Sequence, residues 1–579
     1  MVGSSKTMRS RLTYALLCAL TLIVCVICAR PFVEMGVNDD WSYIRSAQAM
    51  AQTGHIQYFG WTSPILGWQL FLGAIFIKIF GFSFSVTRAS ILLVAAITAF
   101  LMQRTLIHCG ITERNATFGT LTLVLSPLFL PLSFSFMSDM AGFFSLLLCI
   151  YLCIRALQAT TDASAFNWIA LAALSNVLSG TVRQTSWLGL LIIIPSAIWL
   201  LRRRLPLLKT FAVWAFSVAL VLLCIRWFQH QPYTMAEKLI EGPIARGNLR
   251  GLIENVVRFC ISIALFTLPV LIAFLTPAWV RTPRARKAMY AALALILLVT
   301  LFGLRRYQHH TLADILAPFS QNYVTEKGLI DIPSIGIRGT VLSVGVRALV
   351  TLATFAGIFA FTASLTTSNR EPEPSSIHLP LRSLLFLLAP FTCIYLGLLI
   401  PRALSGLMFD RYLLPLLAIA MIVVLRLYQQ KVASQLPILT LACTVLIAAY
   451  GVAALHDVFV MERARLAATE QLRAAGFPRT AFYGGFEYDG WTQMEAWGYV
   501  NSDRLRLPAG LATPDLSTLP VKPCNYIFYR QYAAIRPQYA LSFDDRSCSG
   551  PAPFNPTPYT TWLPPYSGSI YVRSIAPPR

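Results

Sequence analysis

Residues 186–228 read SWLGLLIIIPSAIWLL, RRRLPLLK and TFAVWAFSVALVLLCIRWF, two long apolar runs separated by a short basic cluster. A helix that spans a membrane needs about 20 mainly apolar residues, and its backbone must find its hydrogen bonds within the segment. Runs 186–201 and 210–228 are of helical length, and basic clusters such as residues 202–209 stay on the cytoplasmic side of a membrane. The stretch therefore predicts two spanning helices joined by a cytoplasmic loop.

The composition extends this interpretation to the whole chain. Its 579 residues are 56% hydrophobic and 12% charged, whereas soluble domains carry roughly 25% charged residues. Lipid is therefore expected to be the main solvent. The net charge of +22 comes from short Lys and Arg clusters between apolar runs, a pattern typical of membrane topology and of anionic lipid head groups. No cluster has the aromatic context of a nucleic-acid site, so no nucleic-acid partner is expected.

Thirteen apolar runs are predicted to span the membrane. They lie near residues 12–29, 86–107, 116–135, 139–157, 167–183, 186–201, 210–228, 254–276, 287–304, 340–363, 382–400, 410–427 and 436–455. The first run follows basic residues, as the apolar part of a signal peptide does. Because Arg30 and Pro31 follow it directly, without an evident cleavage site, we expect an uncleaved helix.

One more apolar segment, Pro64 to Phe82, is better placed in the membrane interface. If it spanned the membrane, the basic clusters at 202–209 and 281–287 would lie opposite the basic N-terminus. As an interfacial or re-entrant helix, it leaves all three in the cytoplasm, as the positive-inside rule requires. Thirteen spans then put the C-terminal tail outside.

The composition of the chain changes near residue 455. Residues 1–455 are predicted to form the transmembrane domain, whose long outward segments are residues 30–85, 229–254 and 305–340. Residues 456–579 contain aromatic and Gly-rich pieces typical of strands, such as 480–491, and many prolines. We expect an all-α polytopic membrane protein with a small C-terminal α+β extracytoplasmic domain.

Ten of the twelve cysteines lie in or beside apolar runs, where a thiol usually acts as a small hydrophobe. Only Cys524 and Cys548 lie in the polar tail. In an oxidising compartment these two are the pair expected to form a disulfide, which would contribute about 3 kcal/mol. Two free thiols are the alternative.

Three aspartates lie at the outward ends of the predicted helices. Asp39 and Asp40 follow the first span, and Asp139 opens the fourth span on the same side of the membrane. Adjacent carboxylates near a membrane are costly to desolvate and are usually kept for a partner or a reaction. Each aspartate could also simply cap the helix that follows it.

Guanidinium groups also lie at the outward ends of the predicted helices. Arg183 and Gln184 occupy the short turn between the fifth and sixth spans, and Asp410 and Arg411 open the twelfth. A snorkelling arginine and a simple Asp–Arg pair are the plainer interpretations of these two sites. Together with the aspartates, however, they predict an outward polar site.

In their order and sidedness, these motifs resemble the GT-C superfamily of membrane glycosyltransferases. The similar branch is the one shared by protein O-mannosyltransferases and the bacterial aminoarabinose transferases of lipid A. The resemblance rests on Asp39-Asp40-x-x-Tyr43, the apolar segment after Thr62-Ser63-Pro64, Asp139, and Arg411-Tyr412-Leu413-Leu414-Pro415. The thirteen spans and outward tail also look like the aminoarabinose transferases, whereas the inserted MIR-type domain of the protein O-mannosyltransferases is not seen.

The resemblance implies an inverting hexosyl- or pentosyltransferase in a bacterial inner membrane. Its N-terminus would be cytoplasmic and its C-terminal domain periplasmic or extracellular. Such enzymes move a sugar from a polyprenyl-phosphate donor to a hydroxyl of a lipid, glycan or protein acceptor. One carboxylate must take the acceptor's proton while charge develops on the leaving phosphate.

The resemblance also assigns roles to residues. Asp39 is the expected base, Asp40 is its nearest rival or an orienter of the acceptor, and Asp139 would hold the acceptor or a cation. Guanidinium groups suit the phosphate because they donate in a planar fork and stay charged. The candidates are Arg183 and Arg411, with Arg305 and Arg306 in reserve, and Tyr43, Gln184 and Tyr412 are expected to contact the acceptor or the sugar.

No cofactor follows from these motifs, although a divalent cation would be compatible with them. His309 and His310 are adjacent, but neighbouring histidines seldom form a complete metal site without further ligands. We therefore assign no metal ligands.

Two other kinds of protein share the broad pattern. A multi-span transporter or flippase of envelope glycolipids would carry ionisable residues at mid-span and broken helices, whereas the strongest polar groups here lie at helix ends. A polysaccharide polymerase or ligase would lack both the acid pair after the first helix and the large tail.

Overall fold

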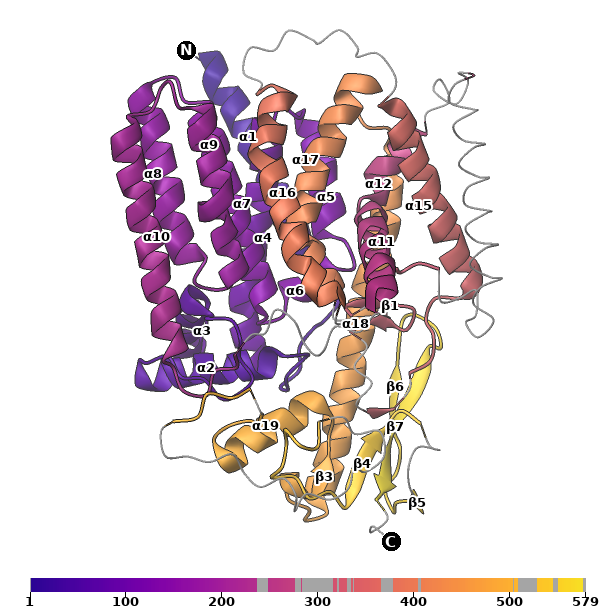
Figure 1. Ribbon diagram of the computed structural model, residues 1–579. Helices are drawn as coiled ribbons and strands as arrows, with labels where there is room; N and C mark the ends of the chain where they lie inside the picture. The colour runs from indigo at the N-terminus through magenta and orange to yellow at the C-terminus, as the bar shows by residue number, and fades with distance from the viewer. Residues whose placement is uncertain are drawn as a thin grey trace.

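The computed structural model describes residues 2–236, 248–275, 283, 316–319, 322–330, 335–336, 338–365, 379–404, 408–502, 504–508, 528–544 and 550–575. Most of these residues are helical, and a small sheet lies near the C-terminus (Figure 1).

The first part of the chain forms a helical bundle with two short helices across one end. The long helices are α1 (Val2–Cys28), α4 (Phe84–His108), α7 (Ser138–Leu157), α8 (Asp162–Ser179) and α10 (Leu207–Gln229). The short elements are α2 (Asp40–Thr53), α3 (Gly67–Phe80), α5 (Glu113–Val124), α6 (Phe129–Ser133), the 3-10 helix η1 (Gln184–Trp187), the π-helix η2 (Gly189–Ile193) and α9 (Ile194–Leu200). Figure 1 shows α2 and α3 lying across the lower end of the bundle, next to the C-terminal region.

The second part completes the bundle and extends it into the tail. Its helices are α11 (Asn248–Phe266), α12 (Leu268–Leu271), η3 (Ile272–Phe274), α15 (Val344–Ser364), α16 (Leu381–Leu404), η6 (Asp410–Leu413), α17 (Leu414–Lys431) and α18 (Ile438–Ala474). A two-stranded hairpin, β1 (Val324–Thr325) and β2 (Gly328–Leu329), lies between η3 and α15 in the sequence.

Seven of the described helices are long and apolar enough to cross a membrane, which identifies an integral membrane protein. They are α4, α7, α10, α15, α16, α18 and the stretch Asp410–Lys431 formed by η6 and α17. The pair Gly251–Phe266 and Leu268–Phe274, bent by 69°, would be an eighth span. Most of α7 and α17 is buried within the bundle, whereas little of α10 and α15 is buried, as expected of helices that face lipid.

Twelve of the thirteen predicted spans contain helix, and the remaining one, 287–304, lies outside the described residues. The prediction of one continuous helix at 116–135 is wrong. There α5 ends at Val124 after 12 residues, and α6 has only five. Pro127 lies between the two helices, and proline lacks the N–H that a continuing helix requires. The number of thirteen spans therefore stays a prediction.

The segment predicted to lie in the membrane interface is helical as α3, which has 14 residues. A span needs about 20 residues, so α3 is too short to cross. Its outer face exposes Phe71, Ile75 and Ile79 at successive turns. Such an apolar stripe on a short helix is typical of a helix lying in the plane of the interface.

The tail combines one helix with a five-stranded sheet. Its elements are the 3-10 helix η7 (Arg479–Ala481), β3 (Phe482–Tyr483), α19 (Phe486–Trp497), β4 (Tyr539–Ser542), β5 (Gly550–Pro551), β6 (Thr557–Thr560) and β7 (Ser567–Ser574). The strands run in the order β3-β4-β7-β5, with β6 also paired to β7. Only the β3–β4 pair is parallel. In the central pair Leu541 lies opposite Val572, and both are buried.

The strand-like interpretation of residues 480–491 is largely wrong, because only β3 is extended and α19 follows it. Gly485 turns the chain with a φ of 100°, which glycine adopts at little cost. The carboxylate of Asp489 then accepts hydrogen bonds from the backbone N–H groups of Gly484 (2.8 Å) and Gly485 (3.1 Å). This local bonding stabilises the start of a helix against the aromatic residues' preference for strand.

The helix α18 joins the bundle to the tail without a break. The boundary predicted at residue 455 falls inside this helix, which has 37 residues (Figure 1). Just beyond that point, the carboxylate of Asp457 accepts hydrogen bonds from the backbone N–H groups of Trp562 (2.7 Å) and Leu563 (2.9 Å). The ring of His456 stacks on the indole of Trp562 at 3.8 Å. These contacts anchor the turn between β6 and β7 to α18.

Candidate active site

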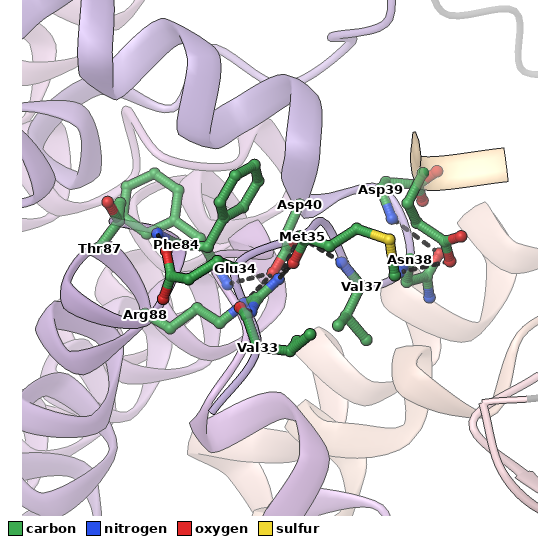
Figure 2. A network of polar contacts seen from close by, with 12 residues as sticks. Val33, Glu34, Met35, Val37, Asn38, Asp39, Asp40, Phe84, Thr87 and Arg88 are labelled. Atoms are coloured by element: carbon green, nitrogen blue, oxygen red, sulfur yellow. Dashed lines mark hydrogen bonds and ion pairs between the residues drawn. The ribbon is translucent and has the colours of Figure 1, made fainter. Parts of the chain in front are cut away.

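Asp40 is held at the start of α2 by a buried ion pair. Its carboxylate accepts hydrogen bonds from Nε (2.7 Å) and Nη2 (3.2 Å) of Arg88 and from the backbone N–H of Val37 (2.8 Å). Arg88 also donates to the carbonyl oxygens of Val33 (3.1 Å) and Met35 (2.6 Å). Figure 2 shows this network, in which the loop before α2 wraps around the guanidinium group.

Asp39, the next residue along the chain, has different surroundings. Its Oδ1 accepts a hydrogen bond from the indole Nε1 of Trp61 (2.9 Å), and its Oδ2 lies 3.6 Å from Nη1 of Arg411. It occupies the N-cap position of α2, but its side chain makes no capping hydrogen bond. The Asp39 side chain is 20% exposed, whereas that of Asp40 is 0% exposed. Of the two acids, Asp39 is therefore the one that a ligand can reach.

The 3-10 helix η6 brings Arg411 to Asp39 from the other end of the chain. The buried carboxylate of Asp410 accepts hydrogen bonds from the backbone N–H groups of Tyr323 (3.0 Å) and Val324 (2.8 Å), which ties η6 to the β1–β2 hairpin. The guanidinium of Arg411 lies 4.9 Å from the ring centre of Phe409. Its Nε and Nη1 are buried and have no hydrogen-bond partner among the described residues. Within the described residues, Nε of Arg411 thus has no partner, and Nη1 has only its ion pair with Asp39.

Asp139 and Arg183 form a second acid–guanidinium pair nearby. Oδ1 of Asp139 accepts a short hydrogen bond from Nη1 of Arg183. Oδ2 of Asp139 is buried without a hydrogen-bond partner in the described part of the chain. The Arg183 guanidinium lies 5.4 Å from the ring centre of Tyr412, whose hydroxyl is 3.2 Å from Nη1 of Arg402. Tyr412 therefore lies between two guanidinium groups.

A cavity opens beside these groups, and Asp39 is next to it through Arg411 but is not one of its lining residues. Its polar wall is formed by Asp139, Arg183, Arg411 and Tyr412, and its apolar wall by Phe143, Leu146, Phe391 and Leu414. Ligand sites are commonly lined by apolar side chains with a few converging polar groups. A lining that combines guanidinium groups with apolar side chains suits an anionic head group attached to a hydrocarbon chain.

The remaining predicted residues are found in different places. Tyr43 is buried in α2, and its pKa is raised. Burial is the main cause of the higher pKa and the charge of Asp39 is the next, while Arg411 lowers the pKa. Gln184 instead donates to the carbonyl of Ser63 (3.1 Å), joining η1 to the loop before α3. The predicted residues that lie outside the described residues are Arg305, Arg306, His309, His310, Cys524 and Cys548.

The structure also brings in residues that the sequence analysis missed. Arg88 lies inside the predicted span 86–107, and an arginine within an apolar run is a signal that could have identified it. Trp61 and Tyr323 carry no such signal, because their roles depend on contacts made over long distances along the chain. The hydroxyl of Tyr323 is buried with no partner among the described residues, and the Arg411 guanidinium lies 6.0 Å from its ring centre.

The charges of the site balance in pairs. Each of the three predicted acids faces one guanidinium: Asp39 with Arg411, Asp40 with Arg88, and Asp139 with Arg183. Within the described ranges no group of three or more His, Cys, Asp or Glu side chains could hold a metal ion. Because each of these acids is balanced by a guanidinium group, the described acids do not fit a divalent cation.

Comparison with known proteins gives matches among solved structures alone. No family model and no curated protein matches the chain. It is similar to ArnT from Cupriavidus metallidurans in the apo state, with 13% identity over 84% of each chain and a TM-score of 0.36. For ArnT bound to undecaprenyl phosphate, the identity is 14% over 81% of this chain and 83% of that one, again with a TM-score of 0.36.

The chain is also similar to the arabinosyltransferase EmbB from Mycobacterium smegmatis, with 15% identity over 70% of this chain and 40% of that one, and a TM-score of 0.30. TM-scores of this size do not establish a shared fold. The functional conclusion below therefore rests on the geometry of the site.

The buried pair makes the stability of the protein depend on Asp40. In Asp40→Asn the Arg88 guanidinium stays buried without a counter-charge, and breaking a buried pair in this way costs roughly 3–5 kcal/mol. The thermal unfolding midpoint of the purified protein in detergent should fall clearly. Asp162→Asn removes an exposed pair with Arg204 and should cost less than about 1 kcal/mol. Equal midpoints for the two variants would contradict the structural role of Asp40.

Proposed function

We propose that this protein is a membrane glycosyltransferase of the GT-C kind. It transfers a hexose or pentose from a polyprenyl-phosphate donor to an acceptor hydroxyl at the outer face of a bacterial inner membrane. The observation that carries the proposal is the approach of Asp39 to Arg411, 3.6 Å apart, beside a cavity lined by two guanidinium groups, one carboxylate and apolar side chains. A reachable carboxylate and a guanidinium with unused donors are the two groups that this transfer requires.

Asp39 is the proposed general base. The acceptor oxygen attacks the anomeric carbon of the sugar, and the bond from that carbon to the phosphate oxygen breaks as the new bond forms. The hydroxyl proton passes to Asp39, and the phosphate leaves with the electron pair, so the configuration inverts. Trp61 supports this role because its indole N–H holds Oδ1 of Asp39 and leaves Oδ2 for the proton.

Arg411 is the proposed donor-phosphate residue. Its Nε and Nη1 lack partners within the described ranges, and a planar fork of donors matches a phosphate group. Phosphate and Asp39 would compete for the same Nη1, so donor binding would release Oδ2 of Asp39 for the acceptor proton. A guanidinium in a partly apolar site also stabilises the charge that develops on the leaving group.

The other predicted acids receive supporting roles. Oδ2 of Asp139 is buried without a described partner, so it can accept a hydrogen bond from a sugar or acceptor hydroxyl. Arg183 is engaged by Asp139 and therefore contributes charge more than free donor groups. Asp40 is a positioning residue, since its full burial against Arg88 leaves no path for an acceptor.

The proposed function requires a defined orientation in the membrane. The thirteen predicted spans place the N-terminus in the cytoplasm and the tail outside, on the same side as Asp39 and Asp139. Lipids, glycans and proteins with an accessible hydroxyl on that side are the acceptor classes, and anionic lipids surround the basic cytoplasmic loops.

The test of the proposed function is Asp39→Asn. An amide keeps the shape and the bond to Trp61 but cannot take a proton, and a general base contributes about 10²–10⁴-fold to the rate. Release of free polyprenyl phosphate from a panel of polyprenyl-phosphate sugars should therefore fall at least about 100-fold in this variant. The exposed Asp162→Asn serves as the matched control and should keep wild-type turnover. Normal turnover in Asp39→Asn would show that Asp39 is not the general base.

Arg411→Ala should weaken donor binding as well as turnover. A phosphate contact acts in both the ground state and the transition state, so KM for the donor should rise while kcat falls. Steady-state kinetics over a range of donor concentrations would separate the two effects, with Arg204→Ala, which removes the pair with Asp162, as the control. An unchanged KM would show that Arg411 does not bind the donor.

The orientation can be tested independently of activity. A reporter fused at Arg204, in the basic loop between α9 and α10, should read as cytoplasmic, and one fused at Ser542, in β4, should read as external. An external signal at Arg204 would contradict the predicted topology and with it the outward position of the site.

A further inference from the structure

We propose that Glu487, in the C-terminal domain, is a positioning residue for Asp39. The inference rests on the proposed function, in which Asp39 is the general base, and it extends that function to the tail. Glu487 lies in the first turn of α19 and is completely buried. Glu487 is far along the chain from the proposed base, and its contacts explain why a carboxylate is buried there.

The first contact links the tail to the backbone of the catalytic loop. Oε1 of Glu487 accepts a hydrogen bond from the backbone N–H of Asn38 (3.1 Å), the residue directly before Asp39. Oε2 of Glu487 accepts from Nη2 of Arg465 (2.5 Å), which lies on α18. A charged acceptor makes a stronger hydrogen bond than a neutral one. The ion pair with Arg465 therefore fixes the carboxylate, and the carboxylate fixes Asn38.

Asn38 needs this support because its backbone is in an unfavourable region. Its φ is 57°, in the left-handed range that few residues other than glycine and asparagine adopt. Its side-chain Oδ1 accepts a hydrogen bond from the backbone N–H of Asp39 (2.9 Å). The orientation of the Asp39 backbone is thus set through Asn38, and Asn38 is held in turn by Glu487.

A second contact with the tail acts through the aromatic rings. Trp61, which donates to Asp39, packs edge-on against Phe486 (5.4 Å between ring centres) and Phe528 (5.9 Å). Trp41, in the first turn of α2, is fully buried against Phe486 at 5.7 Å. The tail therefore supports both the backbone and the side chain of the proposed base.

The packing leaves little room for the tail to shift. A Cβ atom added to Gly490 would lie 2.7 Å from the ring of Trp41, and one added to Gly36 would lie 2.5 Å from the Cβ of Trp41. The backbone of α19 at Gly490 therefore packs directly against the Trp41 ring of α2. A Cβ atom at Gly36 would also lie 3.1 Å from the Cβ of Glu487, so the loop before α2 packs closely against Glu487.

The experiment compares Glu487→Ala with Glu487→Gln and Glu495→Ala. Glu495 lies two turns further along α19, is 42% exposed and pairs with Arg479, so its removal is the matched control. In Glu487→Ala, kcat for release of polyprenyl phosphate should fall about 10- to 100-fold, as expected for a misplaced catalytic group, with an unchanged KM for the donor. Glu487→Gln should recover part of kcat, because its amide oxygen can still accept from Asn38.

Three results would overturn the proposal. They are an unchanged kcat in Glu487→Ala, a rise in KM alone, or an equal loss of kcat in Glu495→Ala. If Glu487→Ala cannot be purified in folded form, Glu487→Gln replaces it, since the amide keeps the size of the side chain but lacks the charge that strengthens the bonds to Asn38 and Arg465. A kcat equal to that of the wild-type protein in Glu487→Gln would likewise overturn the proposal.

Hydrogen exchange separates this inference from the proposed function. The amides of Asn38 and Asp39 should be protected in the wild-type protein and exchange faster in Glu487→Ala, while Glu495→Ala and the amides of α7 remain unaffected. If wild-type protein releases no polyprenyl phosphate from any donor, the proposed function fails, yet this measurement still tests the positioning. Unchanged exchange in Glu487→Ala would overturn the positioning whatever the activity.

Discussion

The buried ion pair between Asp40 and Arg88 is the interaction on which the rest of the site depends. Burying two opposite charges is favourable only when almost every donor and acceptor finds a partner. Arg88 meets this requirement by dividing its donors between Asp40 and the carbonyl oxygens of Val33 and Met35. The loop is thereby folded onto α4 before α2 begins. Asp39 then has to point away from the pair, toward Trp61 and the second part of the chain.

The buried polar groups around this loop fall into two kinds. Asp40 and Asp410 are satisfied by specific donors, and each holds distant parts of the chain together. By contrast, Oδ2 of Asp139 and two nitrogens of Arg411 have no hydrogen-bond partner among the described residues. Buried polar atoms in folded proteins are nearly always hydrogen-bonded, so a group of exceptions in one cavity indicates a ligand site. The same distinction separates the positioning residues from those proposed to contact substrate.

Much of the bundle could be predicted from the sequence, because the length and polarity of an apolar run are local properties. The approach of Asp39 to Arg411 was predicted only as far as a shared side of the membrane, since topology gives sidedness and not distance. The distinct surroundings of Asp39 and Asp40 could not be predicted, because the sequence does not show which of two adjacent aspartates reaches Arg88. The break between α5 and α6 depends on Pro127, and the one before α19 depends on the Gly484–Gly485 turn. Such single residues have little weight when composition is averaged over a long segment.

Because α18 is one unbroken helix, it connects the membrane part rigidly to the tail. A helix of 37 residues is about 55 Å long at 1.5 Å per residue, and it is stiff because its hydrogen bonds are internal. Its first part is apolar enough to lie in the bilayer, and Arg465, near its far end, holds Glu487. Any tilt of the membrane part swings the far end in proportion to its length. The angle at which α18 is held in the bilayer would therefore bear on where Glu487 meets the loop that carries Asp39.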